Sequence, residues 1–215
     1  MVLAAAQFLD SVKALKGCES IKFIKKPRES ELKNLANSFN QAAVESVLGG
    51  IANGADIDLI APFLGLPDKL QIIWELDGSF GETQIISPLA GWFAPFPSAY
   101  SDVLKGFAPI ENIGILDQTT DRVPTSFVIF DKTTPTKRGL WLFDTRSVES
   151  IDLNGEDYLR LSNQGFGFDS WQFLFSQHPI LPDRREAIQK ALDSLAENFP
   201  DRDFSEFQHR LNAFQ

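Results

Sequence analysis

The chain has 215 residues, of which 43% are hydrophobic and 23% charged, and this predicts a globular protein of one domain, alone or with helical extensions. Its net charge of −9 argues against nucleic acid or an anionic membrane surface as the main partner, because phosphate binding depends on clustered Lys and Arg. The single cysteine excludes an internal disulfide, and the chain opens without a basic segment followed by a long apolar run. We therefore expect a cytoplasmic protein that does not cross a membrane and that meets a basic or neutral protein partner.

Two helices are predicted near the start of the chain. Residues 2–15 have a modest helical periodicity that ends at Gly17. Residues 28–48 repeat apolar side chains at three- and four-residue spacing before the Gly49-Gly50 stop. These helices are interpreted as an N-terminal helical extension over residues 1–55.

The segment from Leu66 to Ser79 has the most informative pattern. Pro67 suits the first position of a helix, and Asp77-Gly78 suits a helix end. We predict a short helix, buried on most sides, between these two points. Another short helix is expected just before it, over residues 56–64.

Apolar, strand-forming runs follow in the middle of the chain. Strands are predicted over residues 83–86, 110–116, 126–131 and 139–144. The polar, proline-bearing segment 132–138 predicts a hairpin loop, and the continuous apolar runs on either side of it predict central strands that are covered on both faces. Residues 148–153 either continue the sheet or enter the next turn.

Helices are again predicted after the strands. Asn154 and Asp169 each stand where a helix cap belongs, and amphipathic segments follow toward the C-terminus. The expected helices cover residues 155–161, 170–176, 183–198 and 203–213. The order of helices, strands and helices predicts an α+β fold, with a central, mainly antiparallel sheet wrapped by helices and with extra N- and C-terminal helices. Residues 56–176 would form its core and residues 177–215 a C-terminal helical extension packed on it, unless the whole chain is one compact domain.

The residues that most often carry catalysis or metal binding are few. His178 and His209 are the only histidines, Cys18 is the only cysteine, and none of them stands at a spacing typical of metal ligands. We interpret the histidines as surface side chains and the cysteine as a structural or incidental thiol. No catalytic residue, metal or cofactor is predicted.

Asp131 and Asp144 each follow a phenylalanine at the end of an apolar strand, which suggests a pair of carboxylates. In an antiparallel hairpin these two residues would lie about 15–20 Å apart, at about 3.4 Å per residue. A glycosidase-type pair requires a separation of about 5–10 Å. We interpret both as polar groups at strand ends, and a hydrolase or transferase that depends on carboxylates stays an alternative function.

The segment 91–100 is the best candidate for binding a partner protein. Prolines fix an irregular segment that carries several aromatic rings, and such rings supply rigid contact area. Core packing would account for most of these rings. The candidate partner-binding residues are Trp92, Phe96 and Tyr100.

Positive charge is concentrated in one run near the start of the chain, formed by Lys22, Lys25, Lys26 and Arg28. Residues 1–33 carry a net charge of +3 and the remainder −12. The favoured interpretation is a solvated loop, and the alternative is a docking patch for an acidic partner or for a second copy of the chain.

Several short motifs stand in a fixed order between residues 56 and 176. Leu66-Pro67 begins the predicted helix, Asp77-Gly78 ends it, the two apolar strands follow, and Asp157-Tyr158-Leu159 lies in a later helix. This order resembles the SMI1/KNR4 superfamily, also called SUKH. In that family a helix that begins at Leu-Pro runs into an Asn/Asp-Gly turn, strands follow, and a helix with an aromatic-Leu pair ends the core.

The resemblance implies an α+β domain that binds proteins and has no catalytic set. Many bacterial members of the family are immunity proteins that neutralise toxins, and fungal relatives are linked to cell-wall regulation. We therefore expect a non-enzymatic protein-binding module, either an immunity protein whose partner is a toxin or nuclease or a regulatory interaction protein. An oligomeric scaffold that uses the outer helices is a further alternative.

Overall fold

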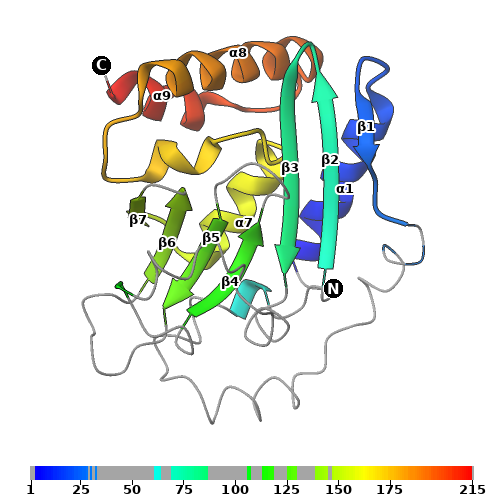
Figure 1. Ribbon diagram of the computed structural model, residues 1–215. Helices are drawn as coiled ribbons and strands as arrows, with labels where there is room; N and C mark the ends of the chain where they lie inside the picture. The colour runs from blue at the N-terminus through cyan, green and yellow to red at the C-terminus, as the bar shows by residue number, and fades with distance from the viewer. Residues whose placement is uncertain are drawn as a thin grey trace.

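The computed structural model describes residues 3–28, 30, 32, 61–63, 69–86, 106–107, 113–118, 125–129, 139–144 and 147–214. Within this part of the chain an antiparallel sheet of seven strands is flanked by helices (Figure 1), so the predicted α+β class is confirmed. Most of the predicted helix over 28–48, the predicted hairpin loop 132–138 and the proline-rich segment 91–100 lie outside the described residues.

The strands follow one another in the sheet in chain order, and each pairs antiparallel with the next. They are β1 (Lys22–Lys25), β2 (Lys69–Leu76), β3 (Ser79–Ile86), β4 (Ile113–Gln118), β5 (Thr125–Ile129), β6 (Gly139–Asp144) and β7 (Ser147–Ile151). The four strands predicted over 83–86, 110–116, 126–131 and 139–144 correspond to β3 to β6. The sheet continues through β7, which resolves the choice left open at residues 148–153.

Helices precede and follow the strands. They are α1 (Leu3–Gly17), α7 (Gly155–Gln164), α8 (Pro182–Asn198) and α9 (Ser205–Ala213), with short 3-10 helices η1 (Ala61–Phe63) and η5 (Trp171–Phe175). Asn154 caps α7 as predicted, because its side-chain oxygen accepts a hydrogen bond from the Asp157 amide at 2.8 Å. In Figure 1, α1 and α7 lie behind the sheet, and α8 and α9 lie at one end of it, with α8 beside the tip of the β2–β3 hairpin.

The buried helix predicted between Pro67 and Leu76 is wrong, because residues 69–76 form strand β2. Asp77 and Gly78 both have positive φ angles, 49° and 74°, as a two-residue hairpin turn requires. Asp-Gly is therefore the β2–β3 turn and not a helix end. Three alternate side chains of the strand are at most 3% exposed, which is the period of a strand rather than of a helix: Ile72, Trp74 and Leu76.

The edge of β3 that faces away from β2 is divided between two partners. Ile85 pairs with Asp117 of β4, whereas the first part of β3 pairs with the segment that follows α7. In that part the Glu82 amide donates to the Gly167 carbonyl at 2.9 Å. The turn after α7, at Gly165-Phe166-Gly167, thus has a second role as a short extension of the sheet.

Two glycines permit this close packing. A Cβ atom on Gly81 would lie 2.1 Å from the ring of Trp74, and one on Gly167 would lie 2.0 Å from the Thr83 hydroxyl. Trp74 is fully buried, and its indole nitrogen donates to the Phe166 carbonyl at 2.8 Å. The glycines are therefore required by the approach of β2 and of the turn after α7 to β3.

One hydrophobic core connects the two ends of the chain. It includes Phe8 and Leu15 of α1, Trp171 of η5, Leu192 of α8 and Phe207 of α9. The terminal helices thus pack on the same core as the sheet, while the predicted boundaries at residues 55 and 176 stay a prediction. In the described part of the chain, no helix has both the length and the apolar character needed to cross a membrane.

Candidate functional site

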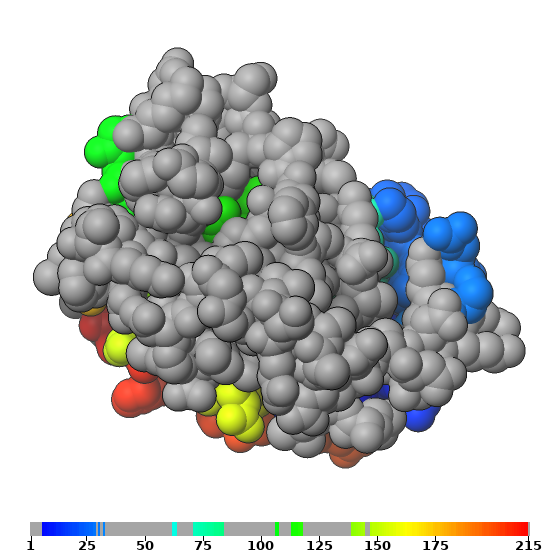
Figure 2. Space-filling view, turned by 90° about the horizontal axis from the view of Figure 1, so that it is seen from below, coloured from blue at the N-terminus to red at the C-terminus, as the bar shows by residue number. Residues whose placement is uncertain are grey.

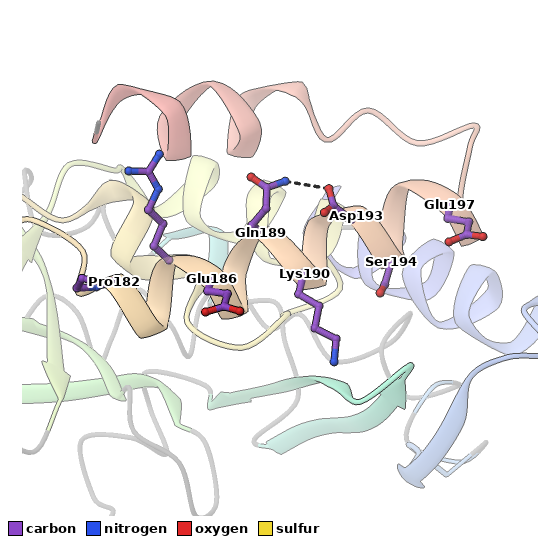
Figure 3. Close-up of a pocket in the computed structure, with 8 residues that line it drawn as sticks. Pro182, Glu186, Gln189, Lys190, Asp193, Ser194 and Glu197 are labelled. Atoms are coloured by element: carbon purple, nitrogen blue, oxygen red, sulfur yellow. Dashed lines mark hydrogen bonds between the residues drawn. The ribbon is translucent and has the colours of Figure 1, made fainter.

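A polar groove runs along α8 (Figure 3). It has a volume of about 540 Å³, and the described residues that line it all belong to this helix: Pro182, Arg185, Glu186, Gln189, Lys190, Asp193, Ser194 and Glu197. The sequence creates this surface because the apolar side chains of α8 are confined to its other face. There Ile188, Ala191, Leu192 and Leu195 are buried in the core.

The charged side chains of the α8 groove leave it slightly acidic. Glu186, Asp193 and Glu197 are exposed carboxylates, against the cations Arg185 and Lys190. Arg185 is engaged at one end, where it donates to the carbonyl of Phe214 at 3.2 Å. These three carboxylates are spaced by seven and four residues, and such a spacing places side chains on one face of a helix. The spacing is the sequence signal for this surface, although no site was predicted there.

Contacts with α9 hold one side of the α8 groove in place. Gln189 donates to Asp193 at 2.8 Å (Figure 3) and exchanges hydrogen bonds with Gln208 of α9 at 3.2 and 3.1 Å. Lys190 extends toward the β2–β3 hairpin in the same view. The groove is thus a fixed polar surface that offers both acceptors and donors to a bound segment.

A buried polar cluster lies between the sheet and α7. The Tyr158 hydroxyl donates to Asp117 Oδ2 at 2.8 Å and accepts a longer bond of 3.4 Å from Gln172. All three residues are at most 2% exposed. The hydrogen bond between Tyr158 and Asp117 joins α7 to β4, and because both residues are buried we interpret it as a structural link.

The three predicted partner-binding residues, Trp92, Phe96 and Tyr100, lie outside the described residues. Asp131 does as well, so the separation of the two strand-end aspartates stays a prediction. Asp144 lies at the end of β6, where its carboxylate pairs with Arg184 of α8 at 2.8 Å.

The two histidines lie on the surface as predicted, since both are exposed. Cys18 is half-buried, and its Sγ atom lies 3.8 Å from the Asn198 side-chain oxygen. No group of three or more His, Cys, Asp or Glu side chains in the described ranges is placed to hold a metal ion.

The basic run is only partly the loop that was predicted, because Lys22 and Lys25 lie on β1. Lys22 Nζ is 3.1 Å from a Glu75 carboxylate oxygen, and Lys25 donates to Gln71. Both lysines therefore connect β1 to β2. The N-terminal segment that contains them (blue) lies on the opposite side of the molecule from the green residues of the middle of the chain in Figure 2. A short edge strand that carries lysines and a bulge discourages pairing with foreign strands.

Comparisons of the chain with protein-family models, with curated proteins and with solved structures found no match. The resemblance to the SUKH superfamily therefore rests on the motifs of the sequence.

Proposed function

We propose that the protein is a non-enzymatic binding module of the SUKH type that holds a basic protein partner on its acidic surface. The observation that carries this proposal is the α8 groove, with the exposed carboxylates Glu186, Asp193 and Glu197. Complementary charge speeds the encounter of two proteins and selects the orientation in which they dock. The net charge of −9 also attracts a basic partner over a longer distance.

Two structural features support the family assignment. The antiparallel sheet is followed along the chain by α7, and the aromatic-Leu pair of that helix, Tyr158-Leu159, is buried in the core. One feature departs from the family arrangement, since a strand stands where the Leu-Pro helix was expected. Within this proposal the partner is a toxin or nuclease, or the target of a regulatory interaction, and the protein acts in the cytoplasm.

The test is a quantitative pull-down from a lysate of the native cell with three proteins in parallel. The first is the wild type, and the second is the triple variant E186Q/D193N/E197Q, which removes the negative charge of the α8 groove. The third, E19Q/D152N/E156Q, removes three exposed carboxylates elsewhere and has the same net charge as the second. A Trp92→Ala/Tyr100→Ala variant tests the aromatic segment separately.

The proposal expects a stoichiometric basic protein whose retention falls at least about tenfold in the α8 triple variant, since several charge pairs are lost. Retention in the control variant should stay near that of the wild type. Equal retention by both triple variants would show that the α8 groove is not the binding surface. Turnover of a substrate in a broad hydrolase and transferase screen would reject the binding-module class itself.

A further inference from the structure

A second polar hollow, separate from the α8 groove, lies between α1, α7 and the loop that joins α8 to α9. Its volume is about 330 Å³, at the lower end of the range for small-molecule sites. Among the residues that the structure describes, all those that line it are polar: Gln7, Asp10, Arg160, Asn163, Gln164 and Arg202. None of these residues also lines the α8 groove.

One of its two arginines is fully engaged within the protein. Arg160 donates to Asp157 at 3.2 and 3.3 Å, to Glu206 at 3.0 and 3.4 Å, and to Gln164 at 3.2 Å. These bonds use all five N–H groups of a guanidinium. Hydrogen bonding to Glu206 raises the pKa of Arg160 above its ordinary value. Arg160 therefore fixes α7 to α9 and has no donor left for a ligand.

The other arginine has a different environment. Arg202 makes no ion pair and no side-chain hydrogen bond with any residue in the part of the chain that the structure describes. Its guanidinium carbon lies 4.7 Å from the centre of the Phe166 ring, which covers one face of the group. Burial lowers the pKa of Arg202, partly offset by the negative charge of Asp10. The N–H groups of this half-buried guanidinium are therefore not used by the described protein groups, and a bound acceptor can reach them in place of water.

We propose that this hollow binds a singly charged carboxylate group, with the Arg202 guanidinium as its main donor and the Gln7 carboxamide beside it. The two oxygens of a carboxylate match the fork of N–H groups on arginine. Asp10, Asp157 and Glu206 place negative charge around the hollow, and this charge repels a doubly charged phosphate more strongly than a singly charged carboxylate. The carboxylate belongs either to a small molecule or to an acidic side chain of a bound protein.

The test is an NMR titration of the whole, ¹⁵N-labelled chain at pH 7. Sodium acetate and an end-blocked peptide with one glutamate serve as the two carboxylate sources, and sodium phosphate and sodium chloride at equal ionic strength as comparisons. Saturable shifts of the Arg202 Nε–H and Gln7 amide signals are expected with a carboxylate and not with chloride. Tighter binding of acetate indicates a small-molecule site, and tighter binding of the peptide indicates a protein side chain.

Variants assign the binding to one guanidinium. R202Q should weaken carboxylate binding about tenfold or more, the loss expected for one charge-assisted contact. R202K, which keeps the charge but lacks the fork, should fall between R202Q and the wild type. R210Q is the matched control, because Arg210 also stacks on a phenylalanine, 5.1 Å from the Phe175 ring centre, but lies outside the hollow. It should bind as the wild type does.

Three results would overturn the proposal. The first is the absence of saturable shifts in the wild type, which requires no variant to fold. The second is an equal loss of affinity in R202Q and R210Q. The third is tighter binding of phosphate than of either carboxylate.

Discussion

Replacing Tyr158 by Phe removes one hydroxyl group from the buried polar cluster and keeps the aromatic ring. The hydroxyl donates to the Asp117 carboxylate at 2.8 Å, and both residues are at most 2% exposed. A hydrogen bond to a charged group contributes about 1.5–3 kcal/mol. Water cannot replace the lost donor at a buried carboxylate without rearrangement, so we expect the free energy of unfolding to fall by about this amount.

The measurement is a urea unfolding curve followed by the fluorescence of the four tryptophans. The midpoint should fall while the denaturant dependence stays unchanged, because the surface exposed on unfolding is the same. Ser176→Ala is a useful comparison, since the Ser176 hydroxyl donates only to a neutral carbonyl, that of His178, at 3.3 Å. Its loss should cost less, about 0.5–1.5 kcal/mol.

A double-mutant cycle with Asp117→Asn isolates the pair. Asn keeps the size of the side chain but lacks the charge that strengthens the bond from Tyr158. The two substitutions together should cost less than the sum of the single costs, with a coupling of about 1 kcal/mol. A Tyr158→Phe variant within about 0.5 kcal/mol of the wild type, or strict additivity in the cycle, would refute the assignment of this pair as a structural link.

Two further predictions concern packing and pH. Gly81→Ala should destabilise the protein by about 1–3 kcal/mol in the same urea assay, because the new methyl group meets the buried ring of Trp74. Gly17→Ala is the control, and it should cost almost nothing because no atom lies within 4 Å of the new Cβ. Hydrogen bonds from Ser205 lower the pKa of the Asp203 carboxyl in the folded protein. The stability that these bonds contribute is therefore complete above the unfolded pKa of about 3.9, and it is lost as the pH falls through the lower folded pKa. Asp203→Asn should remove this pH dependence from hydrogen exchange at the start of α9, and an unchanged acid profile would contradict it.

The error at β2 shows where pattern alone was insufficient. Leucine, isoleucine and tryptophan in residues 70–76 occupy positions that fit both a helix face and an alternating strand. The Asp77-Gly78 pair held the deciding information, because flanked by alternating apolar residues it favours a two-residue hairpin. The pairing of Leu76 with Ser79 across this turn then fixes the register of the whole hairpin.

The sequence by itself determined the features that depend on neighbouring residues. The cap at Asn154, the amphipathic helix α8 and the apolar runs of β5 and β6 follow from local hydrogen bonds and from the period of apolar side chains. These local effects also gave the order of elements that predicts an α+β fold.

Only the tertiary structure decided the features that join distant parts of the chain. The indole of Trp74 meets a carbonyl 92 residues away, and the Ser11 hydroxyl meets one 152 residues away. The strand β1, the divided edge of β3 and the hollow at Arg202 all depend on such contacts. Periodicity shows that a residue faces the core, but it carries no information on which distant residue it meets there, because many pairings of similar apolar surfaces bury comparable area.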